Sequence, residues 1–359
     1  MEAYIVAGYR SAVGKAKKGG FKNYRTDDLA VDVIKHLTSQ VPELDTTKVD
    51  DVIVGCANPE GEQGLQVARL ISARALGKEV PGVTINRYCA SGLEAISMAV
   101  SKVRAGFGDI FIAGGIESMS LIPMTGYKLA PSYKANLENM NYHIGMGHTA
   151  EAVAEKYKIT REASDKFSCE SHIKAANAID NGYFKDEIVP VTVEEVFVKD
   201  GKKVSKSHTV DMDEGVRRET TIEALSKLRP AFKLGGIVTA GSSSQMSDGA
   251  AFVLVMSEEM VKQLGVKPIA RMVTCTSGGV DPLYMGIGPV EAIPKALKQA
   301  GLKLSDIEQT ELNEAFAAQA LAVIQESGLD PDTVNVNGGA IALGHPLGCT
   351  GAKLSIQLL

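Results

Sequence analysis

Short apolar strands alternate with helices through the first 120 residues, and this alternation most constrains how the chain can fold. Runs rich in Val and Ile at 4–8, 51–55, 83–85 and 110–114 predict strands. Helices are predicted between them at 27–37, 64–75 and from residue 93 onward, with Thr26 as the N-cap of the first helix. Strands in this order form mostly parallel sheets that helices cover on both faces, so the sequence predicts an α/β protein.

The last hundred residues repeat this pattern in outline, with strands predicted at 269–276, 310–312 and 334–336 and helices at 290–300, 316–326 and 352–359. The region 118–247 differs from both halves, because it carries Pro123, Pro131, Pro190, a polar helix at 161–181 and a charged segment at 198–218. We therefore expect an N-terminal half formed by residues 1–117 and 248–267, an inserted loop domain at 118–247, and a C-terminal half at 268–359.

The two halves differ in length after their glycine-rich turns. About 23 residues separate Gly92 from Gly115, and they include a helix and a strand. The same count from Gly348 runs past Leu359. We therefore expect the C-terminal half of this sequence to lack its last strands.

The turn at 86–92, Asn-Arg-Tyr-Cys-Ala-Ser-Gly, places Cys89 between a strand and a helix. A helix N-terminus has unpaired N–H groups and a partial positive charge, which favour a thiolate and lower the pKa of a cysteine. The small residues after Cys89 leave room for a substrate carbonyl. The local sequence leaves two hypotheses open, an acidified nucleophile and a small buried side chain.

A second turn, at 338–348, places His345 between Gly344 and Pro346. By element order, His345 lies near the position that Cys89 has in the first half. An imidazole can take a thiol proton near neutral pH, and a Cys–His pair activates sulfur for acyl transfer. Turns at the carboxyl ends of parallel strands meet at one edge, so we expect both turns to share one cleft.

Composition excludes several classes of protein. A net charge of −5 gives no basic footprint for nucleic acid. Five cysteines without disulfide-scaffold spacing indicate a reducing compartment. No apolar run approaches the about 18 residues of a membrane span, and no targeting segment precedes the first strand. We expect a cytoplasmic protein with no nucleic-acid partner and no membrane span.

Two weaker patterns carry no function. The glycine-rich segment 14–20, Gly-Lys-Ala-Lys-Lys-Gly-Gly, lacks the residue order of a phosphate-binding P-loop, so a solvated turn is predicted. His143 and His148 have no companion ligands, so no metal site is predicted.

Six motifs occur in an order that resembles the thiolase family, over essentially the whole chain. They are NRYCASG at 86–92, GGIESMS at 114–120, LRPAF at 228–232, TAGSSSQMSDGA at 239–250, NEAF at 313–316 and GGAIALGHPLGCTGA at 338–352. The resemblance implies a thiolase fold of two similar βαβαβαββ halves, packed as α-β-α-β-α layers with an inserted loop domain.

The resemblance also implies an acyltransferase, in which 3-ketoacyl-CoA and CoA exchange with acyl-CoA and acetyl-CoA through a thioester on Cys89. His345 is similar to the base that activates this cysteine. Asn313 is similar to the residue that positions a water in the oxyanion hole, although it also suits a helix N-cap. The backbone N–H of Cys89 is expected to serve a second oxyanion hole.

The inserted region resembles the CoA-binding loop domain of that family. Ser244 is similar to the residue that hydrogen-bonds the pantetheine arm, and Arg217 to the residue that packs against the adenine; a solvated side chain is the alternative for Arg217. Met146, Phe232 and Phe316 are expected to line the pantetheine tunnel, with ordinary core packing as the alternative. The resemblance implies no metal and no permanently bound cofactor, with CoA and acetyl-CoA as substrates, and a homodimer or homotetramer.

Two departures from the family pattern bear on the activity. Thiolases carry a second catalytic cysteine in a C-x-G motif near the C-terminus, and this sequence ends before it, so we expect acylation but a poor Claisen step. Short-chain acetoacetyl-CoA enzymes usually have His-Met-Gly before Thr-Ala-Glu, whereas the corresponding stretch here starts at Gly145. This difference and HPLGCTG favour the degradative 3-ketoacyl-CoA type. The alternatives are a short-chain acetoacetyl-CoA thiolase, a non-catalytic CoA-binding protein and, last, a decarboxylating ketoacyl synthase.

Overall fold

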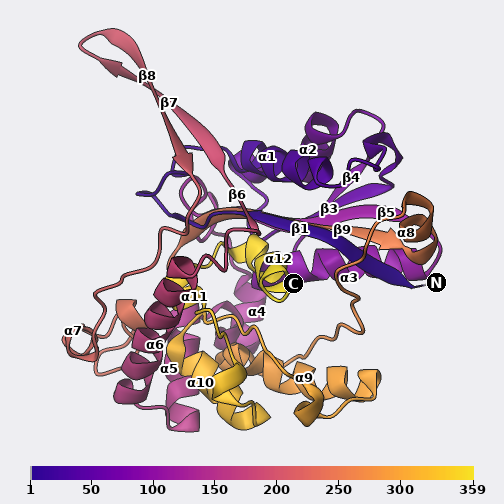
Figure 1. Cartoon of the computed structure of the whole chain (residues 1–359). Coiled ribbons are helices and arrows are strands. Elements are labelled where there is room, and N and C mark those ends of the chain that lie inside the picture. The colour runs from indigo at the N-terminus through magenta and orange to yellow at the C-terminus, as the bar shows by residue number, and fades with distance from the viewer. Residues whose placement is uncertain (1) are drawn as a thin grey trace.

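A seven-stranded mixed sheet forms the centre of the molecule in the computed structural model, which describes residues 2–359 (Figure 1). The strand order is β4-β3-β5-β9-β1-β6, and β2 pairs with β9. The strands are β1 (Ala3–Ser11), β2 (Gly14–Lys15), β3 (Asp51–Cys56), β4 (Gly82–Ile85), β5 (Ile110–Ser118), β6 (Ile188–Val189) and β9 (Ser247–Ser257). The four strands predicted in the first 120 residues are confirmed as β1, β3, β4 and β5.

The direction of β9 differs from the prediction of a mostly parallel sheet. β3 is parallel to β4 and β5, whereas β9 is antiparallel to β1, β2 and β5. The antiparallel direction of β9 follows from the position at which the chain re-enters the sheet. Ser118 at the end of β5 pairs with Asp248 at the start of β9, so the chain returns at the edge where it left and must run back.

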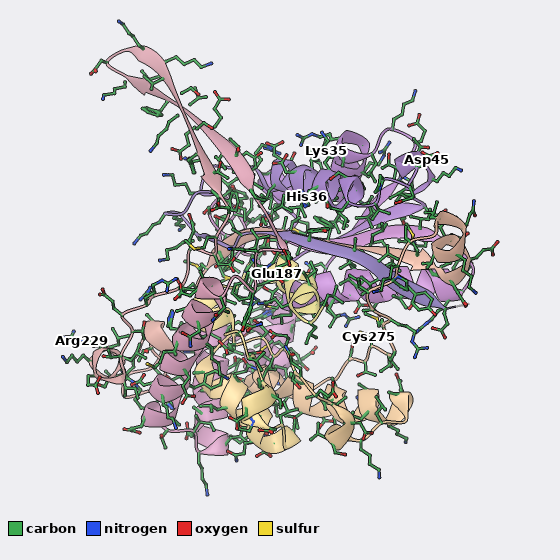
Figure 2. The ribbon with its side chains drawn as sticks, viewed as in Figure 1. Lys35, His36, Asp45, Glu187, Arg229 and Cys275 are labelled. Carbon is green, nitrogen blue, oxygen red and sulfur yellow. The ribbon has the colours of Figure 1, made fainter. Side chains whose placement is uncertain are left out.

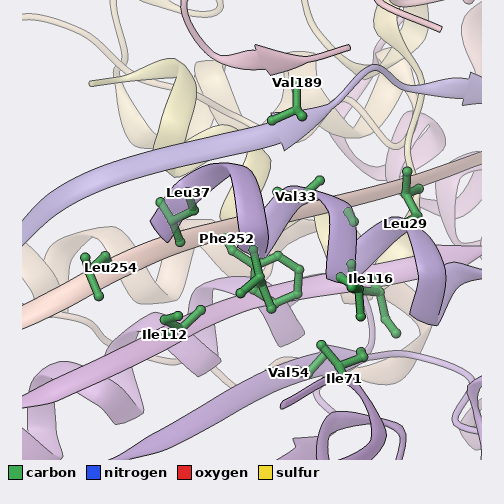
Figure 3. Packing of buried hydrophobic residues seen from close by; sticks show 14 of the residues in the cluster. Leu29, Val33, Leu37, Val54, Ile71, Ile112, Ile116, Val189, Phe252 and Leu254 are labelled. Atoms are coloured by element: carbon green, nitrogen blue, oxygen red, sulfur yellow. The ribbon is translucent and has the colours of Figure 1, made fainter. Parts of the chain in front are cut away.

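Helices cover both faces of this sheet (Figure 1). On one face lie α1 (Thr26–Ser39) and α2 (Val67–Ala75), and on the other lie α3 (Ser91–Arg104) and α12 (Leu347–Gln357). Leu29 and Leu37 of α1 pack over Phe252 and Leu254 of β9 (Figure 3). Thr26 is not the N-cap of α1, since Arg25 holds that position and the Thr26 hydroxyl donates to Gln63.

The region 118–247 contributes helices beside the sheet and a projecting ribbon (Figure 1). Its helices are α4 (Tyr133–Glu138), α5 (Met146–Tyr157), α6 (Arg161–Asp180) and α7 (Ile222–Ser226). The polar helix predicted at 161–181 is confirmed as α6. β7 (Val191–Lys199) and β8 (Lys202–Val210) form the ribbon, while β6 joins the main sheet beside β1.

The C-terminal residues are mainly helical. They form α8 (Glu258–Leu264), α9 (Gly288–Ala300), α10 (Ala317–Ser327), α11 (Ala340–Leu343) and α12. The strands predicted at 269–276, 310–312 and 334–336 are wrong, because these extended segments make only the single bridges Ile5–Ala270 and Thr310–Val334. The Asn335 side chain binds both backbone groups of Leu312, where a ladder would need backbone partners. Within residues 2–359, no helix is long and apolar enough to cross a membrane.

A buried arginine ties the inserted region to the sheet. Arg10 of β1 donates to both carboxylate oxygens of Asp213 at 2.7 and 2.9 Å and to Glu187 at 2.8 Å. Glu187 is labelled near the centre of Figure 2. Arg10 and Asp213 are almost fully buried and are not solvated by water. Each charge is therefore stabilised by the opposite charge of its partner.

The substitution Asp213→Ala is expected to lower the free energy of unfolding by about 3–5 kcal/mol, because it leaves the Arg10 charge buried with one fewer partner. Urea denaturation followed by circular dichroism measures this change. The matched control is Asp180→Ala, which breaks the exposed pair of Asp180 with Arg218 and should cost less than about 1 kcal/mol. Equal losses in the two variants would contradict the prediction.

Candidate active site

Cys89 lies on a strained turn between β4 and α3. Tyr88, directly before it, has a φ of 45°, which is unfavourable for a bulky residue. Two side chains hold this turn. Asn86 Oδ1 accepts from the Tyr88 N–H at 2.8 Å, and the Ser91 hydroxyl donates to the Tyr88 carbonyl at 2.6 Å. The sulfur is thereby presented at the start of α3.

His345 lies on a second turn, between α11 and α12. Gly344 before it has a φ of 101°, and a Cβ built there would meet Ser247 Oγ at 2.3 Å, so this turn requires glycine. The His345 N–H donates to the Gln245 carbonyl at 3.0 Å and to Ser247 Oγ at 3.2 Å. The imidazole is 4% exposed and is therefore fixed in place.

The two turns meet, as the sequence predicted. Cys89 Sγ lies 3.2 Å from His345 Nε2. His345 Nδ1 lies 2.6 Å from Thr350 Oγ1, and the Thr350 hydroxyl itself donates to the Pro346 carbonyl at 2.9 Å. Since that proton is already committed, Thr350 must accept from Nδ1–H, which leaves Nε2 as the bare acceptor facing the thiol.

Both groups of this pair are neutral at physiological pH. Burial and the nearby Glu117 carboxylate raise the pKa of Cys89 to about 11. Burial and the Lys353 charge lower the pKa of His345 to about 4. The expected acidification of Cys89 at a helix N-terminus is therefore wrong, because desolvation and a like charge outweigh the helix end. The geometry provides a thiol donor and a base, rather than a preformed ion pair.

Asn313 joins this pair. Its Nδ2 lies 3.3 Å from His345 Nε2, and its Oδ1 is buried without a hydrogen-bond partner among residues 2–359. An amide oxygen in this position can accept a hydrogen bond from a water or a substrate group. Asn313 is not a helix N-cap, since α10 begins four residues later and Phe316 holds the cap position.

Four of the five predicted CoA-contact residues lie on segments that contact one another and that include the residues directly after Asn313. The Ser244 N–H donates to the carbonyl of Ala315, and the Phe232 and Phe316 rings pack edge to face with centroids 5.9 Å apart. The start of α5 lies against Phe232, and the Met146 side chain there is 47% exposed. These side chains are thus partly or largely exposed and are not fully buried core.

Arg217 lies farther along the inserted region, and its side chain is exposed. Its backbone N–H donates to His172 Nδ1 at 3.1 Å. Gln245, next to Ser244, donates to the carbonyls of Gly215, Ile341 and Ala342. Gln245 therefore connects the Arg217 segment to the His345 turn. Gln245 and Thr350 were not predicted as functional residues, although they lie inside the motifs at 239–250 and 338–352.

An open cavity of about 610 Å³ lies between α5, the segment around Phe232 and residues 282–287, and it is separate from the Cys–His pair. Its lining residues are His148, Glu151, Ala152, Glu155, Lys156, Phe232, Lys233, Leu283 and Tyr284. No group of three His, Cys, Asp or Glu side chains within residues 2–359 could hold a metal ion.

The glycine-rich segment 14–20 binds a carboxylate of the protein itself. Glu214 accepts hydrogen bonds from the Lys15 and Gly20 N–H groups, both at 2.9 Å. A Cβ at Gly19 would meet the same carboxylate at 1.8 Å. The loop is therefore occupied by Glu214, and its backbone donors are not open to a phosphate.

The sheet, the two turns and the neutral Cys–His pair define an enzyme of the acyl-transfer class, in which a base activates a sulfur nucleophile. The model of the thiolase N-terminal domain matches residues 3–259, and that of the thiolase C-terminal domain matches residues 266–359. The chain belongs to the thiolase family and is an acyltransferase.

Relatives and solved structures agree with this assignment. Over its full length the chain is 52% identical to the 3-ketoacyl-CoA thiolase of Bacillus subtilis (strain 168) and covers 92% of it. The crystal structure of human mitochondrial 3-ketoacyl-CoA thiolase matches with a TM-score of 0.89 at 38% identity, covering 99% of this chain and 91% of that one. The Bacillus anthracis acetyl-CoA acetyltransferase has the same TM-score and coverage at 39% identity. The predicted thiolase fold is confirmed.

Proposed function

We propose that this chain exchanges 3-ketoacyl-CoA and CoA with acyl-CoA and acetyl-CoA, with Cys89 as the nucleophile, His345 as the base and Asn313 in the oxyanion hole. The observation that carries the proposal is the 3.2 Å contact of Cys89 Sγ with His345 Nε2, in the tautomer that can accept a proton. The 52% identity to a 3-ketoacyl-CoA thiolase supports the degradative type.

The reaction divides into two transfers of one acyl group. In the first, Cys89 sulfur bonds to the 3-keto carbon, the C2–C3 bond breaks and acetyl-CoA leaves. The proton that His345 takes from Cys89 balances the proton that acetyl-CoA gains. In the second, the CoA sulfur attacks the thioester, and its proton returns through His345 to Cys89. Asn313 acts on one oxyanion through a water that it orients, and the backbone N–H of Cys89 serves the second oxyanion hole, on the acyl-enzyme.

The Thr350 hydroxyl sets the tautomer on which this proton transfer depends. Thr350→Val keeps the shape and removes the acceptor for Nδ1–H, so we expect the acylation rate to fall about tenfold to a hundredfold. Thr350→Ser keeps a hydroxyl and should recover most of the rate. Rapid-quench mass spectrometry with acetyl-CoA measures both variants, and equal rates for Val and Ser would refute the role.

CoA is proposed to bind along the inserted region, with Ser244 on the pantetheine arm and Arg217 on the adenine. Met146, Phe232 and Phe316 would form the apolar walls of the pantetheine tunnel. Gly145, where short-chain enzymes usually have His, has open space around its Cβ position. The absence of a His side chain at this position supports an acyl group longer than acetyl.

Thiolysis assays with acetoacetyl-CoA and with a medium-chain 3-ketoacyl-CoA test this proposal, together with the mass of the acylated protein. We expect an acyl adduct on Cys89 and faster turnover of the longer substrate. Faster turnover of acetoacetyl-CoA would support the short-chain alternative. CoA binding with neither adduct nor turnover would support the non-catalytic alternative.

We propose a cytoplasmic homodimer or homotetramer of three parts, residues 1–117 with 248–267, 118–247 and 268–359. The sheet ends in β4, whose outer edge is unpaired within residues 2–359. Large apolar side chains are exposed on the segments that flank β4, namely Leu65, Leu70, Tyr88 and Leu93. An open edge with such neighbours favours pairing with a second copy. Sedimentation velocity tests this, since a single species of monomer mass would refute it.

A further inference from the structure

A buried carboxylate, Glu117, lies between the Cys89 turn and the His345 turn. It is the last residue but one of β5 and is 1% exposed. Its Oε2 accepts from the N–H groups of Ala57 and Gly348, both at 2.9 Å. Ala57 follows β3 and Gly348 is the second residue of α12, so one oxygen joins segments from both halves of the chain.

The other oxygen is also bound by donors. Glu117 Oε1 accepts from Gln63 Nε2 at 2.7 Å and from the Asn58 N–H at 3.4 Å. The orientation of the Gln63 amide is fixed, because its Oε1 accepts from the Ser118 N–H. These four groups are N–H donors, and the Cys56 thiol donates weakly to Oε1 at 4.0 Å, so the hydrogen bonds favour the ionised carboxylate. Within residues 2–359, Glu117 has no ion-pair partner.

One set of hydrogen bonds leads from Glu117 to the nucleophile. The Ala57 carbonyl accepts from Asn86 Nδ2 at 2.9 Å. Asn86 Oδ1 in turn accepts from the N–H of Tyr88, the strained residue before Cys89. The position of Ala57 therefore sets the position of the Cys89 turn.

A second set leads from Glu117 to the base. The Gly348 N–H is one of the free donors in the first turn of α12, where a carboxylate also meets the positive end of the helix. Thr350 lies two residues further along α12 and accepts from His345 Nδ1. The carboxylate that holds the start of α12 thus holds the group that orients the imidazole.

We propose that Glu117 is a positioning residue for acyl transfer, whose carboxylate holds the Cys89 and His345 turns in place relative to each other and whose negative charge acts on the Cys89 thiol. The proposal rests on the function proposed above. It differs from that function in assigning a role to a group that touches neither sulfur nor imidazole.

The charges around Glu117 agree with this role. In addition to burial, its carboxylate raises the pKa of three thiols, those of Cys56, Cys89 and Cys349. Burial raises the pKa of Glu117 itself, while its four donors oppose that shift. Burial, together with the positive charge of Lys353 of α12, lowers the pKa of His345.

Two variants separate the charge of Glu117 from its geometry. Glu117→Gln keeps the length and removes the charge, whereas Glu117→Asp keeps the charge and withdraws the oxygens from Gly348 and Ala57. The rate of Cys89 alkylation by iodoacetamide against pH, followed by peptide mass spectrometry, reports the charge. The rate of acyl-enzyme formation from acetyl-CoA reports the geometry.

For Glu117→Gln we expect the midpoint of the alkylation profile to move to lower pH by roughly one unit, and acylation to fall about tenfold. For Glu117→Asp we expect a similar loss of acylation with an unmoved midpoint. Asp248→Asn is the control, because it removes another buried carboxylate, bound by Ser118 and Ser120, and should leave the midpoint unchanged. Thermal melts verify that each variant is folded.

If the alkylation midpoint of Glu117→Gln equals that of the wild type, the charge of Glu117 does not act on the Cys89 thiol. If the acylation rate is unchanged in both variants, Glu117 does not position the two turns. A folded Glu117→Gln that behaves as Asp248→Asn does would show a structural role only. Failure of the wild-type protein itself to form an acyl adduct would instead refute the proposed function. The alkylation profiles would then still decide whether Glu117 controls the thiol.

Discussion

Replacing Cys89 by alanine is expected to abolish the acyl-enzyme completely. The wild-type protein should gain the mass of one acetyl group on incubation with acetyl-CoA, and Cys89→Ala should gain none. The reason is geometric, because Cys89 Sγ is the sulfur that contacts the His345 base. Cys56 and Cys349 are buried, whereas Cys89 is partly exposed. Intact-protein mass spectrometry and peptide mapping measure the outcome.

The matched control is Cys275→Ala. Cys275, which is labelled in Figure 2, is a partly exposed free cysteine on the segment that leads to α9. This variant should acylate at the wild-type rate, which separates loss of the nucleophile from loss of any thiol. An adduct that persists in Cys89→Ala, or that disappears in Cys275→Ala, would show that Cys89 is not the nucleophile.

The first half of the fold was predictable because each strand there is a short apolar run that pairs along its whole length. β1, β3, β4 and β5 all lie where the Val- and Ile-rich runs predicted them. The C-terminal segments at 269–276, 310–312 and 334–336 have the same apolar character as these strands, but each forms only a single β-bridge. Apolar composition signals burial, whereas a strand also needs partners for its backbone, and a local pattern does not contain them. The antiparallel direction of β9 depends on where the 118–247 region returns the chain, which is likewise a non-local property.

The candidate site was predictable in its residues and not in its electrostatics. The turns at Cys89 and His345 have local signatures, glycine and small residues beside one reactive side chain. The direction in which the pKa of the Cys89 thiol is shifted depends on burial and on Glu117, which lies 28 positions further along the chain. The helix N-terminus, which the sequence does predict, has the smaller effect on the pKa of this thiol. Thr350 and Glu117 act through contacts that only the folded chain reveals.

Replacing His345 by alanine should slow the acylation of Cys89 by about a hundredfold to ten-thousandfold at neutral pH, the usual value of a general base. The thiol then has no acceptor for its proton, and with a pKa of about 11 it is almost entirely protonated at pH 7. Rapid-quench mass spectrometry with acetyl-CoA measures the rate. His143→Ala, at an exposed histidine outside the site, is the control and should acylate normally.

The pH dependence of that rate distinguishes a lost base from a distorted site. In the wild-type protein the pKa of His345 is lowered to about 4, so the base is neutral and competent across pH 6–9 and the rate should be nearly flat. In His345→Ala the reaction needs free thiolate, so the rate should rise about tenfold per pH unit throughout that range, because the pKa of Cys89 lies above it. If the His345→Ala variant acylates slowly and its rate is as independent of pH as that of the wild type, His345 maintains the shape of the turn rather than accepting the proton. A steep wild-type profile would mean that the resting pair is not neutral, which the buried imidazole and the Nδ1–Thr350 bond argue against.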